Sequence, residues 1–245
     1  MKKAILAVSF GTRYAEAEQK CIRPVEQALE RAFPDREVRR AYTSPTIRRL
    51  LAREGCDVPG EAEALEALER EGYGDVVVAP THIIPGQEYV RVLETARGCP
   101  VSEPLLAAEE DLDWMARLLE QIAQEEGRPL LMMGHGTEHA ADSTYARLRE
   151  KLAENVFLAC VEGAHTLEAL MPRLEKMDER KIALMPLMLV AGDHARNDLA
   201  GDAPDSWKSQ LEARGFDVRV RMQGLGELDA VRARFVEKAL RVATR

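Results

Sequence analysis

Short apolar runs alternate with amphipathic segments along the whole chain, and this alternation is the feature that most constrains the fold. Strands that alternate with helices predict a parallel sheet with helices on both of its faces. The apolar runs predict strands at residues 4–9, 37–42, 75–79, 101–105, 129–133, 156–161, 181–187 and 217–222. The amphipathic segments predict helices at 15–32, 61–71, 88–97, 110–126, 140–154, 166–178, 205–214 and 227–243. The chain is therefore expected to adopt an α/β fold.

Three loops of the first half recur in the second half, in the same order. Pro80, Gly86 and Glu88 correspond to Pro186, Gly192 and His194 at a constant offset of 106 residues. The turn Ser9-Phe10-Gly11-Thr12 is similar to Gly134-His135-Gly136-Thr137, and residues 41–47 are similar to residues 161–167 at an offset of 120. Three such pairs in one order favour an internal duplication.

The duplication favours two similar doubly wound parallel-sheet domains over the single large domain that 245 residues would also allow. We place their boundary after Gly127, where glycine and proline separate a predicted helix from the next strand. The predicted domains are residues 1–127 and 128–245. Open parallel sheets bind ligands beyond the carboxyl ends of their strands, so we expect an active-site cleft between the two domains.

Composition and charge exclude several classes of protein. A net charge of −8 disfavours binding to nucleic acid, which requires lysine and arginine to neutralise phosphates. No apolar run approaches the roughly 18 to 20 residues that cross a bilayer, and residues 1–8 are better explained as a first strand than as a signal peptide. The four cysteines are dispersed, which fits reduced thiols in the cytoplasm. The sequence lacks the glycine-rich nucleotide signatures, so no nucleotide cofactor is expected.

The second half carries a set of metal-competent side chains, each directly after a predicted strand. They are His135 between two glycines, Glu162 after an apolar strand, and His194 in an abrupt polar loop. Loops after parallel strands share one edge of a sheet, so the three residues are expected at one site. Two imidazoles and one carboxylate suit Co²⁺, Fe²⁺, Ni²⁺ or Zn²⁺ and leave coordination positions open for a substrate. Asp193, Asn197 and Asp198 are candidates to orient the imidazole of His194.

Two residues of the first half are further candidates. Glu88 occupies the position equivalent to His194 and is expected to act as a proton relay or as a secondary metal site, although a carboxylate at the start of a helix is also stabilised by the helix dipole alone. His82 begins the loop that leads to Glu88 and is expected to line the cleft. His139 is expected either to support a metal ligand or to lie at the surface, and His165 is expected to have a local role beside the helix N-cap Thr166.

Several stretches of the sequence resemble the anaerobic cobaltochelatase family, which inserts cobalt into sirohydrochlorin during the oxygen-independent synthesis of cobalamin. The similar stretches are LAVSFGT at residues 6–12, THIIPGQEY at 81–89, MGHG at 133–136, VE at 161–162 and MPLMLVAGDHARND at 185–198. The resemblance runs nearly from end to end of the chain, and the last stretch is the longest and most specific.

The resemblance implies a two-domain class II chelatase fold with metal ligands at His135, Glu162 and His194. It also implies that His135 helps to take the pyrrole protons and that Glu88 faces the metal across the cleft. One histidine cannot ligate the metal and accept a proton at once, so His135 must alternate between these roles or share the base role with Glu88. The residues expected to contact the tetrapyrrole are Ser9, Phe10, Gly11, Thr12, His82 and Arg196, the last through a macrocycle carboxylate.

Other functions fit parts of this pattern. The same site could deliver Fe²⁺ or Ni²⁺, because imidazole and carboxylate separate these ions poorly. A carrier would bind a finished tetrapyrrole or a metal and would need no base. A periplasmic-type sensor with two α/β lobes would need a signal peptide and hinge linkers, and neither is recognisable in the sequence. Assembly of the chain into a homo-oligomer is also compatible with the sequence.

Overall fold

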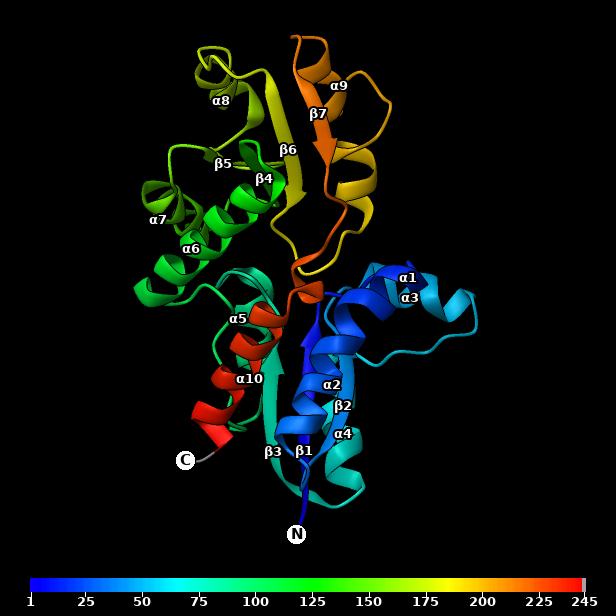
Figure 1. The fold of residues 1–245 in the computed structure, drawn as a ribbon. Helices are drawn as coiled ribbons and strands as arrows, with labels where there is room; N and C mark the ends of the chain where they lie inside the picture. Colours follow the sequence, from blue (N-terminus) through cyan, green and yellow to red (C-terminus); the bar gives the residue numbers. More distant parts are fainter. Residues whose placement is uncertain (244–245) are drawn as a thin grey trace. The chain divides into compact units, whose positions relative to one another are not determined.

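The computed structural model describes residues 1–243, which form two compact units, each built around its own parallel sheet (Figure 1). Unit 1 contains residues 1–105 and the C-terminal segment from Gly226 onward, and unit 2 contains residues 106–225. Two parallel-sheet arrangements of strands and helices confirm the predicted α/β class.

The sheet of unit 1 has three parallel strands in the order β2-β1-β3. Their bounds are Lys2–Ser9 for β1, Glu37–Tyr42 for β2 and Tyr73–Pro80 for β3. The central strand β1 is buried from Ala4 to Ser9, as expected for a strand covered on both faces. The strand predicted at 101–105 is wrong, because only Val101 pairs, in a single parallel bridge to Val78.

Helices cover both faces of the unit 1 sheet. On one face, Leu6 and Val78 belong to an apolar cluster with Leu65 of α4 and Val92 of α5. Helices α2 and α10 contact each other, and α10 also packs on β3. The helical segments of unit 1 are α1 (Ala15–Ala17), the π-helix η1 (Glu18–Ile22), α2 (Arg23–Ala32), α3 (Pro45–Arg53), α4 (Glu61–Arg70), α5 (Gln87–Thr95) and α10 (Asp229–Ala243), with the 3₁₀ turn η4 (Leu225–Glu227) leading into α10.

The sheet of unit 2 has four parallel strands in the order β5-β4-β6-β7. Their bounds are Leu130–Gly134 for β4, Val156–Cys160 for β5, Lys181–Pro186 for β6 and Asp217–Val220 for β7. One face packs on α8, α9 and η3 through an apolar cluster that includes Leu131, Leu184, Leu170 and Trp207. The helical segments are α6 (Glu109–Glu126), the 3₁₀ turn η2 (Ala140–Asp142), α7 (Ser143–Lys151), α8 (Leu167–Leu174), the π-helix η3 (Ala195–Leu199) and α9 (Trp207–Glu212).

The two sheets repeat one topology, because the order β2-β1-β3 corresponds to β5-β4-β6. Hydrogen bonds at the strand ends repeat as well: Thr81 N–H donates to Val8 O, and Leu187 N–H donates to Met133 O. This pair keeps the predicted offset of 106 residues. The duplication expected from the sequence is therefore visible in the backbone.

The offset of 120 predicted for the loops after β2 and β5 is wrong by two residues. Thr43 N–H donates to Ser9 O, whereas Val161 N–H donates to Gly134 O, and these two donors lie 118 residues apart in the sequence. Short apolar segments align almost equally well at neighbouring registers, and the backbone pairing decides between them.

The compact units do not follow the predicted boundary after Gly127. Helix α6 contacts β4, β5 and α7 and belongs to unit 2, and α10 belongs to unit 1, so the chain crosses between the units twice. The apolar face of α6 was recognisable from its helical period, but the period of a helix does not indicate which sheet that face covers.

Helix α3 was missed by the sequence analysis. Its N-cap is Ser44, whose hydroxyl accepts a hydrogen bond from Ile47 N–H, and Pro45 occupies its first position. Serine followed by proline is a helix-start signal that could have predicted it. In residues 1–243 we find no helix that is both long and apolar enough to cross a membrane.

Candidate functional site

His135 lies in the loop after β4, beside the loop after β5. Gly136 has φ +81°, and a Cβ there would lie 1.9 Å from the carbonyl oxygen of Glu162, so only glycine fits. The N–H of Glu162 donates to the carbonyl of His135 at 2.9 Å. The two loops are thus joined through their backbones, which places His135 and Glu162 next to each other at one edge of the sheet.

Both metal-competent histidines use Nδ1 as a donor. In His135, Nδ1 lies 2.9 Å from the carbonyl oxygen of Gly136. In His194, Nδ1 lies 2.6 Å from Oδ2 of Asp198. Carbonyl and carboxylate oxygens accept hydrogen bonds, so Nδ1 carries the proton in each neutral ring and Nε2 keeps its lone pair. This is the tautomer that a metal ion needs for ligation through Nε2.

The segment that carries His194 has an unusual backbone. The π-helix η3 begins directly after His194, and its backbone places Asp198, four residues later, beside the imidazole. Short π-helical turns occur frequently at functional sites. Asp198, one of the residues proposed to orient His194, is bonded to its ring.

The structure brings the two histidines together from different strands. The ring centroids of His135 and His194 lie 4.9 Å apart, with the ring planes at 88°. Within residues 1–243 no group of three or more histidine, cysteine, aspartate or glutamate side chains is preformed for a metal ion. The backbone places Glu162 next to His135. The role of Glu162 as the third metal ligand stays a prediction.

Cys160 ends β5 beneath this site and does not compete for a metal. Its thiol is buried close to Gly134 and Tyr145. Burial raises the pKa of Cys160 to about 12, so the residue is a neutral thiol near pH 7 and a poor metal ligand. The imidazoles and the carboxylate remain as the donors at this edge.

The equivalent edge of unit 1 is built from hydroxyl groups. The hydroxyl groups of Ser9 and Thr81, at the ends of β1 and β3, lie 2.8 Å apart in a buried hydrogen bond. The Thr12 hydroxyl accepts a hydrogen bond from Tyr14 N–H, and Gly11 has φ +99°. Phe10 is 51% exposed between them. This turn therefore offers an apolar side chain on a rigid backbone, with no metal ligand.

Glu88 lies in the first turn of α5, after the N-cap Gly86. Its Oε2 accepts a hydrogen bond from Arg91 at 2.8 Å. Arg91 also donates to Oε1 of Glu61 at 3.1 Å and to the carbonyl oxygen of Thr43 at 2.5 Å. Arg91 and Glu61 were not predicted from the sequence. The spacing of three residues between Glu88 and Arg91 is typical of ion pairs on one helix face and could have indicated Arg91.

His82 has an unusual environment. Both ring nitrogens are buried, and neither has a hydrogen-bond partner among the described residues. Burial, reinforced by the positive charge of Arg91, lowers the pKa of His82 to about 4. The imidazole is therefore neutral near pH 7 and keeps an unused donor and an unused acceptor.

The remaining predicted residues lie near these two edges or have local roles. Arg196 lies in η3, two residues after His194. His139 is the N-cap of η2, and its Nδ1 accepts from Ala141 N–H. Thr166 caps α8, as predicted, and the Nδ1 of His165 lies 2.6 Å from Arg149.

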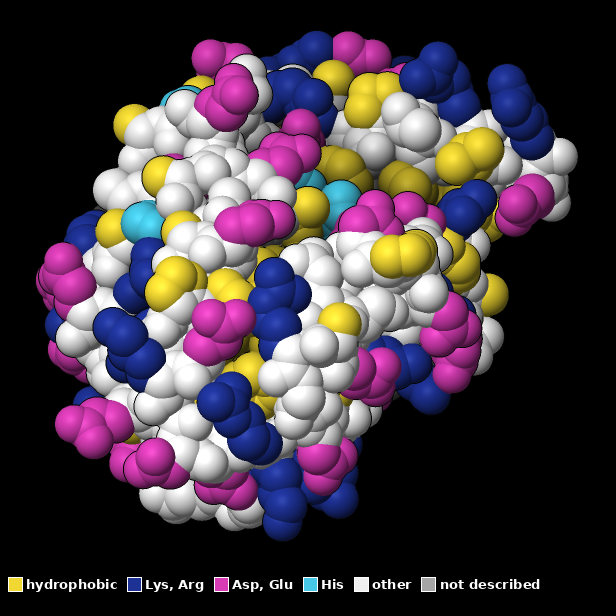
Figure 2. Space-filling view, turned by 90° about the horizontal axis from the view of Figure 1, so that it is seen from above, with side chains coloured by type: hydrophobic (Ala, Val, Ile, Leu, Met, Phe, Trp, Pro, Cys, Tyr) yellow, Lys and Arg dark blue, Asp and Glu magenta, His cyan; other side chains and the backbone are white. Residues whose placement is uncertain are grey.

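The surface carries both signs of charge. In Figure 2, lysine and arginine side chains are scattered among acidic ones on this face, and histidine side chains reach the surface beside carboxylates. No single basic patch gathers on this face, as expected for a chain of net charge −8.

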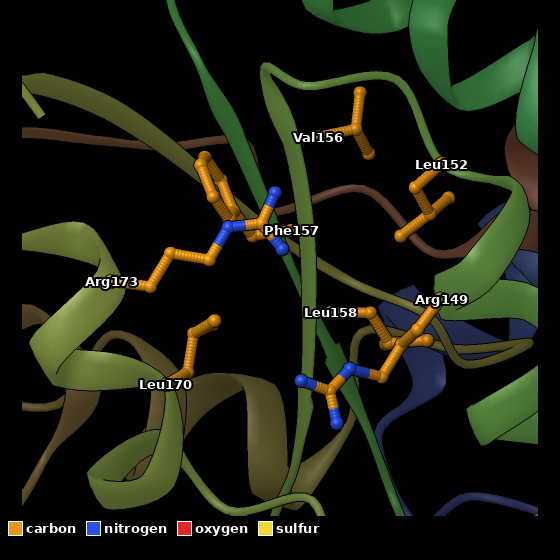
Figure 3. A pocket seen from close by; sticks show the side chains of 7 residues that line it. All are labelled: Arg149, Leu152, Val156, Phe157, Leu158, Leu170 and Arg173. Atoms are coloured by element: carbon orange, nitrogen blue, oxygen red, sulfur yellow. The ribbon is translucent and has the colours of Figure 1, made fainter.

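Cavities found in the structure lie away from the predicted residues. A cavity of about 20 Å³ lies beside the edge strand β5, where Arg173 of α8 stacks on Phe157 and Arg149 of α7 also lines the cavity (Figure 3). A second cavity, of about 230 Å³, lies between α4 and the start of β3, beside Cys99.

Comparisons with known proteins identify relatives over nearly the whole chain. The cobalt chelatase (CbiK) family matches residues 3–244. The chain is 38% identical over 249 residues to the sirohydrochlorin cobaltochelatase of Salmonella typhimurium, covering 96% of this chain and 94% of that protein. It is 34% identical over 243 residues to the sirohydrochlorin cobaltochelatase CbiKC of Nitratidesulfovibrio vulgaris, covering 93% of this chain and 86% of that protein.

Similarity to solved structures is weaker. A Lac repressor crystal structure bound to ONPG is 10% identical, with a TM-score of 0.43, and the match covers 100% of this chain and 76% of that one. The sequence relationships, in contrast, extend over both units. The chain belongs to the cobalt chelatase (CbiK) family.

Proposed function

We propose that this protein is a metal chelatase that inserts Co²⁺ into sirohydrochlorin, the reaction named for its two relatives. The observation that carries the proposal is the contact between His135 and His194, whose rings are held as the tautomer that leaves Nε2 available. A pair of imidazoles on exposed loops suits a metal that is a substrate, because such a metal must be released after it is taken up.

The metal ion is proposed to bind His135, Glu162 and His194. Neutral imidazole and carboxylate donors accept first-row divalent ions, and three protein ligands leave positions open for the nitrogens of the macrocycle. The hydrogen bond from His194 to Asp198 supports this assignment, since ligating histidines commonly donate their other N–H to a carboxylate. The same donors also admit Fe²⁺ or Ni²⁺, so the supply of metal in the cell selects the ion.

Insertion of a divalent ion releases the two inner N–H protons of the macrocycle, and a base must receive them. His135 can accept a proton only when its Nε2 is not bound to the metal. We therefore assign the base role to His135 in alternation with ligation, and to Glu88, a carboxylate whose side chain is 35% exposed.

The macrocycle is proposed to contact the turn from Ser9 to Thr12, where Phe10 offers an exposed apolar side chain, together with His82 and Arg196. The ring nitrogens of His82 have no hydrogen-bond partner among the described residues, and the guanidinium of Arg196 suits a carboxylate of the macrocycle. We propose no nucleotide cofactor, a cytoplasmic location in keeping with the free cysteines, and assembly into a homo-oligomer as a further proposal.

The function is tested by anaerobic absorbance of the protein with sirohydrochlorin and Co²⁺. Wild-type protein should convert the free macrocycle to the cobalt form, and the variants His135→Ala and His194→Ala should lose most of this activity. His139→Ala is the matched control, because this exposed histidine caps η2 and is given no role in the reaction. A macrocycle that binds without metallation would indicate a carrier, and equal rates in all variants would refute the proposed ligands.

A further inference from the structure

Arg91 connects three separate elements of unit 1. From α5 its guanidinium donates to Glu88 on the same helix, to Glu61 at the start of α4, and to the carbonyl oxygen of Thr43 in the loop after β2. Thr43 and Glu61 are buried, at 2% and 8% exposure. The rigid planar fork of arginine can satisfy several acceptors at once, and here two of the three acceptors belong to the packed interior of unit 1.

The contact with Glu88 uses one carboxylate oxygen. Oε2 receives the hydrogen bond from Arg91, and among residues 1–243 no other side chain or backbone group bonds to this carboxylate. Oε1 is left without a partner on a side chain that is otherwise fixed. Without Arg91, the rotatable bonds of Glu88 would let the carboxylate sample many positions, so the hydrogen bond from Arg91 limits the freedom of this side chain.

The charges around Arg91 match this arrangement. Glu61 and Glu88 supply two negative charges against one guanidinium, so the trio carries a net charge of −1 when both carboxylates are ionised. One proton arriving at Glu88 makes the trio neutral. His82, the other titratable group that Arg91 influences, is kept neutral by burial and by this same positive charge.

We propose that Arg91 is a positioning residue for metal insertion, which holds Glu88 through Oε2 so that Oε1 receives a pyrrole proton. This inference rests on the proposed base role of Glu88. Arg91 itself takes no proton. In the step, the N–H bond of the macrocycle breaks, an O–H bond forms at Glu88, and the nitrogen electron pair goes to the metal.

The test compares Arg91→Gln, Arg91→Lys, Glu88→Gln and the double variant in the full chain, with kcat and KM measured anaerobically for sirohydrochlorin and Co²⁺. Arg91→Gln should lower kcat by about tenfold or more and leave KM nearly unchanged, because a misplaced base slows proton transfer without weakening binding. Arg91→Lys should retain an intermediate kcat, since lysine keeps the charge and loses the fork.

Arg97→Gln is the matched control. Arg97 lies just after α5 and pairs with Glu66 of α4 on the exposed surface, so it links the same two helices without touching Glu88. This control should keep wild-type kcat. Thermal unfolding of all variants shows whether lost activity follows lost folding, and Arg91→Lys supplies the kinetic comparison if Arg91→Gln does not fold.

The double variant separates the inference from the function on which it rests. If Arg91 acts through Glu88, its replacement should change kcat by less than about twofold once Glu88 is glutamine. If the losses of kcat in the two single variants multiply in the double variant, Arg91 does not act through Glu88, and Glu88 remains the base. A wild-type kcat in Glu88→Gln would overturn the base role and this inference with it, whereas a raised KM alone in Arg91→Gln would make Arg91 a substrate contact instead.

Discussion

The loops after β3 and β6 occupy equivalent positions in the two units and carry different chemistry. After β3, Glu88 starts a regular α-helix and is bonded to Arg91. After β6, His194 precedes a π-helix, is bonded to Asp198, and contacts the ring of His135. The hydrogen-bond partner of the functional group is supplied in each case by the helical segment at that position: an arginine for the carboxylate and an aspartate for the imidazole.

The two equivalent loops of the duplicated scaffold carry out different tasks. Both loops follow a strand whose end makes the same backbone hydrogen bond to the central strand, through Thr81 and Leu187. Unit 2 gathers neutral nitrogen donors, which suit a metal ion, and unit 1 holds a carboxylate and a buried neutral imidazole, which suit protons and hydrogen bonds. The predictions below test this division of roles.

The largest effect is expected from His194→Glu, which gives the second loop the side chain of the first. The variant should lower kcat/KM for Co²⁺ by more than the roughly 100-fold that loss of an outer hydrogen-bond partner can cost, because a ligand is replaced and Asp198 then faces another carboxylate. Steady-state metallation rates at several Co²⁺ concentrations measure this loss of kcat/KM. Activity near that of wild type would show that the two loops do not have different roles.

Two equivalent glycines provide the second test. Gly136→Ala should destabilise the protein by about 3 to 5 kcal/mol, because φ is positive and the new Cβ would overlap the backbone of Glu162. Gly11→Ala should cost about 2 to 3 kcal/mol, since φ is positive and the new Cβ would lie 2.6 Å from Cδ2 of the buried Tyr42 ring. Urea unfolding measures both.

Gly127→Ala is the control for these glycines, because its φ is also positive and no atom lies within 4 Å of the position of a new Cβ. It should cost about 1 to 2 kcal/mol from backbone strain alone. Equal losses of stability in all three variants would show that the close approach of the loops adds nothing to the backbone strain of a positive φ.

A smaller effect is expected from Asp198→Asn. The amide keeps an oxygen acceptor but loses the charge that supports His194, so the affinity for Co²⁺ should fall by about 10- to 100-fold. Titration with Co²⁺, followed by its visible absorption bands, measures this affinity. Glu138→Gln, an exposed carboxylate on the loop after β4, is the control, and an unchanged affinity in Asp198→Asn would remove Asp198 from the site.

The smallest effect concerns His82. Its folded pKa of about 4 lies below the value of about 6.5 in an unfolded chain, so the unfolded state binds more protons between these values. Stability should therefore be complete above pH 7 and decline as pH falls, by about 1 to 2 kcal/mol at pH 5. Urea unfolding of wild type and His82→Leu at both pH values tests this, and a slope that survives the substitution would assign the loss to other groups.

Much of this structure was predictable from local patterns. The alternation of apolar runs and helical segments predicted the parallel α/β class, and the offset of 106 residues predicted the relation between the loops after β3 and β6. His135 stood out because glycines flank it at a strand end, and the structure shows why Gly136 must be glycine. Pairs of residues that meet only through folding could not be predicted from local patterns. Arg91 and Glu61 lie on different helices, and neither was identified.

Most strands and helices followed from the sequence alone, because burial on a strand or a helix imposes a period that is local in the chain, although helix α3 was missed and the strand at 101–105 was wrong. The tertiary structure alone decided that α6 joins unit 2 and that α10 returns to unit 1. It also decided that His135 and His194, from loops that follow different strands, meet at 4.9 Å, and that Arg91 joins three elements. The period of apolar side chains indicates that one face of a helix or strand is buried. Only the packing of the whole chain determines which element covers that face.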